Sequence, residues 1–133
     1  MRGVYLVAAE LARRGFIASP TSRSAQGADL LVTDQRCSKA FSVQVKTNAS
    51  AFSFFLVGAA THNLRSRSHV FVLVNLRRDR TEFFVVPSRA VSDRIVEWRR
   101  KTGTVWYGVL CRDLSRYKER WDVFGAADAA PPR

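Results

Sequence analysis

Residues 41–47 read FSVQVKT and alternate strictly between apolar and polar side chains. Successive side chains of a β-strand point to opposite faces, so Val43 and Val45 share the face that we expect to enter a core. Gln44 and Lys46 share the opposite face, roughly 7 Å apart along the strand. The stretch therefore predicts a central strand whose polar face carries a carboxamide and an ammonium group.

The preceding residues predict a partner for this strand. Residues 28–34 read ADLLVTD and predict a second strand with an acid, Asp29, near its start. Residues 35–39 form only a short connection to a strand at residues 40–47. Such a short connection favours an antiparallel hairpin, because parallel strands need a long crossover.

The register of this hairpin decides which side chains meet. Facing residues of an antiparallel pair have a constant index sum, which is about 74 for a turn centred near Cys37. Asp29 then faces Val45. A shift of one residue in either direction puts Asp29 on the face of Gln44 and Lys46, so the spacing permits a cluster of these three side chains without requiring it.

Apolar side chains at helical spacing predict two helices. Residues 3–14 have the i, i+3, i+4, i+7 pattern of an amphipathic helix. Residues 88–100 place Val91, Ile95 and Trp98 on one face, and we expect that face to point inward.

Other segments complete the expected order of elements. Residues 52–57 fit either a strand or the start of a helix, and residues 58–67 fit a short helix or a loop. We also expect strands at residues 16–19, 69–76, 81–86 and, at a sheet edge, 105–110, followed by a terminal helix at residues 113–124.

Length and composition limit the class of protein. A chain of 133 residues has the size of one domain, which we expect at residues 1–124 with a disordered tail at 125–133. No apolar run reaches the ~20 residues of a membrane span, and no signal peptide precedes the first helix, so we expect a cytoplasmic protein without a membrane partner. The two cysteines and two histidines lack the spacing of a disulfide framework or a zinc site.

The charge of the chain predicts a polyanionic partner. The formal net charge is +11, and a strongly basic domain most often binds nucleic acid. The alternative is compositional, because surface arginine is often only solvated. We expect Ser22 and Arg23 to contact phosphate from the polar loop at residues 20–27, for which a purely solvated loop is the alternative reading.

This order of elements, with its short motifs, resembles the PD-(D/E)XK nuclease superfamily, which includes type II restriction enzymes, archaeal Holliday-junction resolvases and small bacterial proteins. The resemblance extends over residues 3–88. Within the superfamily, the chain resembles the small bacterial branch, with a D…QxK variant of the motif. It implies an α/β fold with a restriction-endonuclease-like core, in which helices flank a mixed central sheet in the order αβββαβ. The residues that carry the resemblance are Gly15-Phe16, Ala28-Asp29-Leu30-Leu31 and Val43-Gln44-Val45-Lys46-Thr47.

The resemblance also implies a site. In that superfamily an acid on the first helix, an acid on the second strand and an acid in the third-strand motif bind Mg²⁺, and a lysine two residues later orients the attacking water. Asp29 matches the strand acid, and Lys46 matches the lysine. Gln44 occupies the position of the motif acid, and Glu10 is the only acid on the first helix. The implied activity is hydrolysis of DNA phosphodiester bonds with Mg²⁺ or Mn²⁺ bound to Asp29, Gln44 and Glu10.

The same resemblance implies the partners of the protein. DNA would contact Lys46, in addition to the expected phosphate contacts of Ser22 and Arg23. Many nucleases of this type act as dimers and so cut both strands of a duplex, which makes a homodimer an expected assembly.

Two departures from the superfamily pattern keep other readings open. Gln44 is neutral where the superfamily has an acid. The helix acid of related small proteins would stand near Tyr5, so that Glu10 comes about five residues later and roughly 140° around the helix. The alternative is a catalytically decayed module on the same fold that binds nucleic acid or a protein partner. A third reading is a small subunit of a toxin–immunity or defence system.

Overall fold

The computed structural model describes residues 2–22, 27–49, 53–59, 61 and 65–126. Two α-helices, eight strands and two 3₁₀ segments lie in these ranges. In chain order they are α1 (Arg2–Arg13), β1 (Ile17–Pro20), β2 (Leu30–Thr33), β3 (Ala40–Asn48), β4 (Phe54–Val57), β5 (His69–Leu76), β6 (Thr81–Pro87), α2 (Ser88–Ser92), β7 (Val96–Arg99), β8 (Val105–Leu110), η2 (Cys111–Tyr117) and η3 (Trp121–Phe124).

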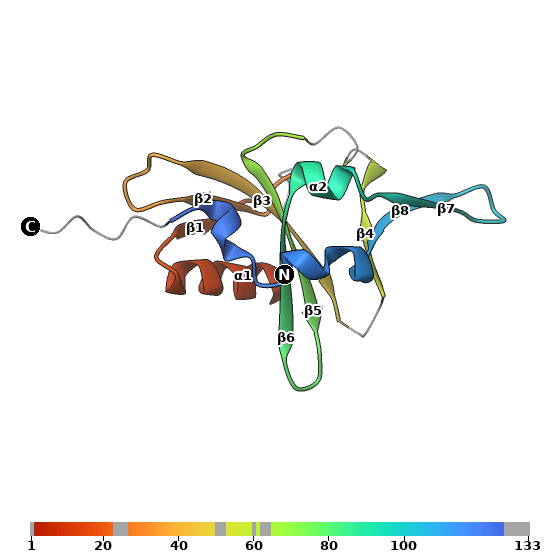
Figure 1. Ribbon diagram of the computed structural model, residues 1–133, viewed down its shortest axis with the longest axis horizontal. Coiled ribbons are helices and arrows are strands. Elements are labelled where there is room, and N and C mark those ends of the chain that lie inside the picture. Colours follow the sequence, from red (N-terminus) through yellow and green to blue (C-terminus); the bar gives the residue numbers. More distant parts are fainter. Residues whose placement is uncertain (1, 23–26, 50–52, 60, 62–64, 127–133) are drawn as a thin grey trace, which may run out of the picture.

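The strands form two sheets (Figure 1). The larger sheet has the order β1-β2-β3-β5-β6. Its strands are antiparallel to their neighbours except for β3 and β5, which run parallel. The smaller sheet has the order β4-β8-β7 and is antiparallel throughout. The mixed central sheet with flanking helices confirms the expected α/β class.

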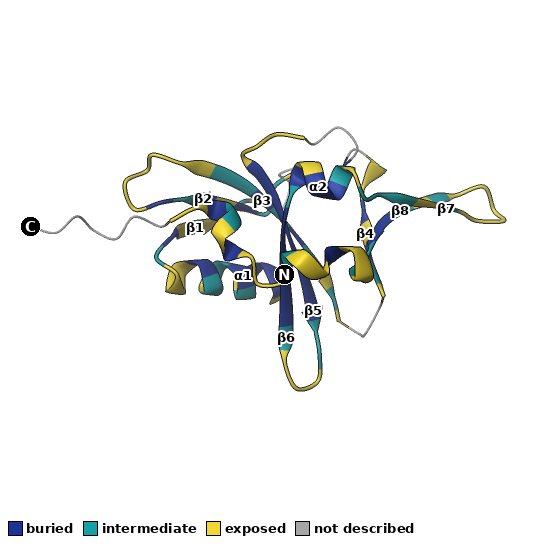
Figure 2. Ribbon diagram, viewed as in Figure 1, coloured by how far each residue is buried: buried dark blue, intermediate teal, exposed yellow. Residues whose placement is uncertain are grey.

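Strand β5 lies at the centre of the core (Figure 2). Every residue from His69 to Asn75 is buried, as expected for a strand covered on both faces. On one face Val72 joins a cluster with Val7 and Leu11 of α1. On the other face the aromatic and leucine side chains of β5 pack against Phe55 of β4 and residues of β8. The smaller sheet therefore covers one face of the larger sheet, and α1 covers the other.

The predicted hairpin is confirmed. Strands β2 and β3 pair antiparallel, with Leu30 opposite Val43 and Thr33 opposite Ala40. The index sum of these pairs is 73, one step from the central expectation. The predicted strands at residues 69–76 and 81–86 also form, and they pair with each other.

The predicted helix at residues 88–100 is wrong beyond its first turn. Helix α2 ends at Ser92, and residues 96–99 form β7. The spacing of Val91, Ile95 and Trp98 fits a helix, but Val96 and Trp98 also fit the alternation of a strand. Pairing with β8, in which Trp98 lies opposite Trp106, decides between the two periods. As a result β8 is the middle strand of its sheet and not an edge strand.

Of the two readings open for residues 52–57, the strand is confirmed by β4 at Phe54–Val57. The helix expected at residues 113–124 is replaced by two 3₁₀ segments. The terminal segment forms η2 and η3 because the Glu119 amide donates to the Phe83 carbonyl at 2.9 Å and breaks the helical ladder. Leu114, Trp121 and Phe124 are nevertheless buried, as the pattern of residues 113–124 predicts. Most of the expected tail, residues 127–133, lies outside the described residues.

No helix among the described residues is long and apolar enough to cross a membrane.

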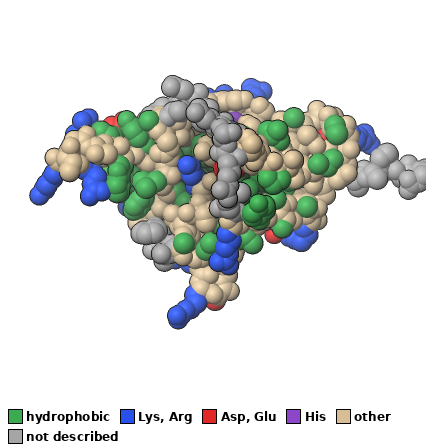
Figure 3. Space-filling model, turned by 180° about the vertical axis from the view of Figure 1, so that it is seen from behind, with side chains coloured by type: hydrophobic (Ala, Val, Ile, Leu, Met, Phe, Trp, Pro, Cys, Tyr) green, Lys and Arg blue, Asp and Glu red, His purple; other side chains and the backbone are tan. Residues whose placement is uncertain are grey.

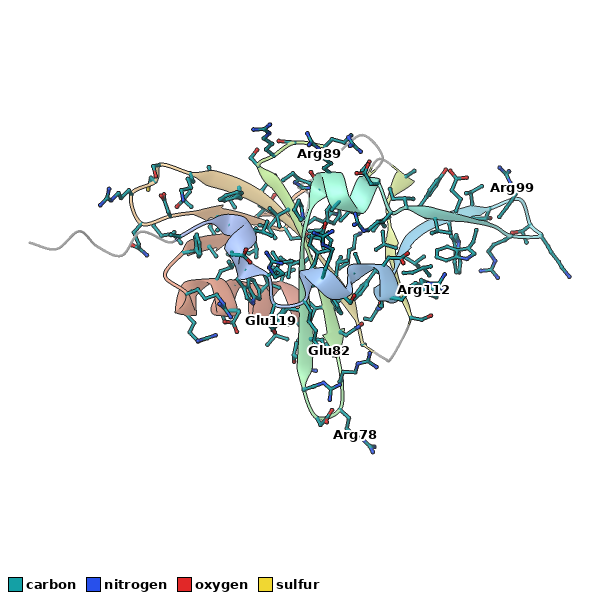
Figure 4. All side chains as sticks on the ribbon, in the orientation of Figure 1. Arg78, Glu82, Arg89, Arg99, Arg112 and Glu119 are labelled. Carbon is teal, nitrogen blue, oxygen red and sulfur yellow. The ribbon has the colours of Figure 1, made fainter. Side chains whose placement is uncertain are left out.

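A buried carboxylate joins the terminal segment to the sheet (Figure 4). The side chain of Glu82 on β6 is 8% exposed and lies 2.9 Å from Arg77 Nε and 3.0 Å from Lys118 Nζ. The hydrogen bond from Arg77 is the main cause that lowers the pKa of Glu82 from its ordinary value of 4.5 to about 2, against the opposing effect of burial. The ionised carboxylate therefore stabilises the folded chain.

We expect Glu82→Gln to lower the free energy of unfolding at pH 7 by up to about 3 kcal/mol, because 1.36 kcal/mol corresponds to one unit of pKa. Because folding lowers the pKa of Glu82, its contribution is complete above about pH 5 and is lost as the pH falls from 4.5 toward 2. Urea denaturation at pH 7 and pH 3 measures this difference, which should shrink at pH 3.

Asp79→Asn is the matched control, since the Asp79 side chain is 76% exposed in the turn between β5 and β6. Its stability should stay close to that of the wild type at pH 7. Equal stability of Glu82→Gln and wild type at pH 7 would contradict the assigned role of Glu82.

Candidate functional site

The register of β2 against β3 places Asp29 beside the polar face of β3. Asp29 comes directly before Leu30, the first paired residue of β2, which lies opposite Val43. The Asp29 amide donates to the Val43 carbonyl at 2.7 Å. Its carboxylate Oδ2 accepts a hydrogen bond of 2.8 Å from the Val45 amide. The Asp29 carboxylate thus lies against the β3 backbone between the residues of the Gln-x-Lys motif.

A turn before β2 holds Asp29 in this position. The Thr21 amide donates to the Asp29 carbonyl at 2.9 Å. The Thr21 hydroxyl donates to the Ala28 carbonyl at 2.7 Å. These two bonds join the two ends of the polar loop. Thr21 therefore fixes the backbone at Ala28 and Asp29.

Gln44 and Lys46 lie on the side of the larger sheet that faces the smaller sheet. In the parallel register Gln44 is beside Phe71, and Lys46 is beside Leu73. Both of these β5 side chains pack against the smaller sheet. Gln44 and Lys46 are half-buried. The smaller sheet therefore covers this polar face of β3 only in part.

Lys46 lines a cavity of about 540 Å³ together with residues of β4 and with Trp106 of β8. No hydrogen bond or ion pair joins its ammonium group to the part of the chain that the structure describes. Leu56 and Trp106 form the opposite wall of the cavity. Asn48, at the end of β3, donates from its amide to the Phe54 carbonyl at 2.9 Å and so fixes β4 as part of that wall. The arrangement places one cation beside an apolar wall, where electrostatic interactions are stronger than in open water.

The structure places Glu10 in the C-terminal half of α1, where its carboxylate pairs with Arg13 and with Arg14, the latter at 2.9 Å. The opposite end of α1 approaches β3, since a Cβ atom added at Gly3 would lie 1.8 Å from Thr47 Oγ1. This end of α1 therefore lies against Thr47 through Gly3. The Glu10 carboxylate is held by its own helix.

Of the two residues expected to contact phosphate from the polar loop, Ser22 is exposed. Arg23 lies outside the described residues. Their contact with nucleic acid stays a prediction.

Asp29 and Gln44 carry oxygen donors, the type of ligand that a magnesium ion prefers. Among the described residues, no group of three or more His, Cys, Asp or Glu could hold a metal ion. Mg²⁺ is commonly bound by one or two carboxylates and keeps several waters and substrate phosphate oxygens as further ligands. A carboxylate offers about four lone-pair sites, so the bond from Val45 leaves Asp29 with capacity for a metal. The Gln44 carboxamide adds a neutral oxygen.

Sequence patterns did not identify two residues of this cavity. Leu56 is 45% exposed and Trp106 is 38% exposed. The signal for Trp106 is its position in the alternating stretch of residues 105–110, where a large aromatic side chain falls on the face opposite the buried Val109. Leu56 and Trp106 both point to the outer face of the smaller sheet, and a contiguous apolar patch on a surface is typical of an interaction site.

Comparison with known proteins identifies the fold. No family model matches the chain, and no curated protein matches it either. The structure resembles that of Hjc, a Holliday junction resolvase from the archaeal hyperthermophile Archaeoglobus fulgidus, with a TM-score of 0.63. The two chains are 14% identical, and the match covers 94% of this chain and 98% of the resolvase. The chain thus has a restriction-endonuclease-like fold.

We expect Asp29→Ala to lower the free energy of unfolding by about 1–3 kcal/mol, because it leaves the Val45 amide without its partner. Asp29→Asn keeps an acceptor oxygen and should cost less than about 1 kcal/mol. Urea denaturation in the presence of EDTA checks both values, with Asp79→Ala as an exposed control. Equal losses in the two Asp29 variants would contradict a structural role for the Val45 bond.

Proposed function

We propose that the protein is a metal-dependent endonuclease of the PD-(D/E)XK superfamily that hydrolyses phosphodiester bonds of DNA. The observation that carries the proposal is the hydrogen bond of 2.8 Å from the Val45 amide to the Asp29 carboxylate, because Val45 stands between Gln44 and Lys46 in the chain. The restriction-endonuclease-like fold supports it, because the match covers nearly the whole of a resolvase chain.

In this proposal each side chain has a separate role. Asp29 and the Gln44 carboxamide oxygen would hold Mg²⁺ or Mn²⁺ together with an oxygen of the scissile phosphate. The bound ion supplies polarisation of the phosphate and a more acidic water. The Lys46 ammonium would orient the attacking water and stabilise the added negative charge on the phosphate. The hydrogen bond from Val45 keeps the Asp29 carboxylate oriented before substrate binds.

The charge of the chain supports DNA as the substrate. A net charge of +11 raises both the rate of association with a polyanion and the affinity for it. One similar solved structure is that of a Holliday junction resolvase, which makes branched DNA the first substrate to test. A homodimer of this chain would allow both strands of a duplex to be cut.

Two features of the site favour a second candidate, a module that binds nucleic acid or a protein without cutting. Gln44 brings no charge to a metal ion. Glu10 is engaged by Arg13 and Arg14. Of the acids proposed for the site, this leaves Asp29, whose carboxylate accepts from the Val45 amide of β3. Divalent metal would then bind weakly or not at all.

We expect the wild type to cut branched DNA with Mg²⁺ or Mn²⁺, and Lys46→Ala to reduce the rate by at least about 100-fold through loss of transition-state charge stabilisation. Asp29→Asn should reduce it similarly while preserving the fold. Single-turnover cleavage of end-labelled branched, single-stranded and duplex DNA measures these rates, with RNA as a further substrate.

Lys39→Ala is the matched control, because Lys39 is an exposed lysine in the turn between β2 and β3. Its cleavage rate should stay within about twofold of the wild type. Salt-dependent DNA binding by a wild type that cuts no substrate would favour the second candidate. Equal cutting by wild type and Lys46→Ala would place the activity at another site or in a contaminant.

A further inference from the structure

The outer face of the smaller sheet is apolar. Side chains of β4 and β8 alternate, so Phe55 and Val109 enter the core and their neighbours point away from it. Figure 3 shows hydrophobic side chains gathered over this sheet, with lysine or arginine side chains at its far end. The outward side chains are Phe54 and Leu56 of β4, Val96 and Trp98 of β7, and Trp106 and Leu110 of β8.

A glycine lets this face lie flat. A Cβ atom added at Gly108 would lie 2.7 Å from Trp98 Cζ3, so the Trp98 ring covers the Gly108 backbone. The Trp98 and Phe54 rings contact each other with centroids 5.2 Å apart. These two rings fix the floor of the face, and the more exposed Trp106 stands beside them.

Trp106 lines two cavities, which we refer to together as the groove. The cavity of about 540 Å³ runs from Lys46 to Trp106. A second cavity of about 440 Å³ runs from Trp106 to Arg100, whose guanidinium lies 4.4 Å from the centre of the Trp106 ring. Phe54 lines both cavities. The groove thus has Lys46 in one cavity and, in the other, the Arg100 guanidinium stacked on the exposed Trp106 indole.

We propose that this groove binds unpaired nucleotides of the nucleic-acid substrate next to the phosphate that is cut, with a base stacked on the Trp106 indole. The proposal rests on the proposed function, since it continues the groove from Lys46. Phosphates would lie near Lys46 and Arg100, and bases would lie on the aromatic surface between them. This combination of charge and stacking is how single-stranded nucleic acid is bound without sequence preference.

The same features select the class of substrate. Bases in a continuous duplex are already stacked on each other, so a duplex offers phosphate to the groove but no free base face. Single-stranded or branched nucleic acid with unpaired bases offers both. A second copy of this chain fits less well, because two chains of charge +11 would bring cations at both ends of the groove together.

We expect Trp106→Ala to weaken binding of a single strand by about 5- to 150-fold, the range measured for loss of one base–aromatic stack. Its binding of a blunt duplex of the same length should stay within about twofold. Trp106→Phe should restore most of the single-strand affinity and guards against a simple loss of folding. Fluorescence anisotropy with end-labelled DNA in EDTA measures binding without cleavage.

Ile17→Ala is the control for loss of an exposed apolar side chain, since Ile17 is 45% exposed on the edge strand β1. Arg100→Ala should reduce the slope of log affinity against log salt for the single strand by about 0.7. Arg78→Ala, at the turn between β5 and β6, is its control and should leave single-strand affinity and slope near wild type (Figure 4).

The results separate this inference from the proposed function. The inference about the groove is contradicted if Trp106→Ala binds a single strand as tightly as the wild type does. It is also contradicted if the variant loses affinity equally for single strand and duplex, even when Lys46-dependent cleavage is found. If Trp106→Ala selectively loses single-strand affinity but the wild type cleaves no substrate, the inference that the groove binds nucleotides is supported and the proposed nuclease activity is contradicted. If Trp106→Ala instead converts a dimer to a monomer in analytical ultracentrifugation with unchanged DNA binding, the face is an interface between copies and the inference fails.

Discussion

The hydrogen bond of 2.8 Å from the Val45 amide to Asp29 Oδ2 is the contact on which the candidate site depends. It forms because β2 and β3 pair with an index sum of 73. A slip of one residue would turn Asp29 toward the core and Leu30 toward the surface. Burial of Leu30 and Val43, both fully inaccessible, therefore fixes the position of the acid as well as the packing of the sheet.

The smaller sheet turns this polar face into a cavity. Strand β5 is buried on both sides, so its second face needs a cover, which Phe55 and Val109 supply. Asn48 holds β4 at the end of β3, through bonds to the Phe54 carbonyl and to the Asn75 side chain at 3.2 Å. The cover ends beside Lys46 and leaves that lysine in contact with an apolar wall. The smaller sheet thus both completes the core and forms the apolar surroundings of Lys46.

Local alternation was sufficient to predict β3, and the short turn was sufficient to predict its hairpin with β2. The register could be predicted only to within one residue, because turn geometry is not encoded in spacing alone. The helix expected at residues 88–100 failed because Val91, Ile95 and Trp98 fit the spacing of a helix, whereas Val96 and Trp98 fit the alternation of a strand. Only contact with β8, which lies later in the chain, selects the strand at residues 96–99. The groove at Trp106 depends on this tertiary pairing, so it was not visible in the sequence.

The central claim is that Asp29, through a bound metal ion, and Lys46, through its ammonium group, both contact the phosphate whose phosphodiester bond is hydrolysed. The most direct test is a crystal structure of the full chain with Mg²⁺ and a non-cleavable branched DNA that carries a phosphorothioate. The account predicts a metal ion bound to the Asp29 carboxylate and to an oxygen of a backbone phosphate that also contacts the Lys46 ammonium. DNA bound on another surface, with neither metal nor phosphate at Asp29 and Lys46, would contradict it.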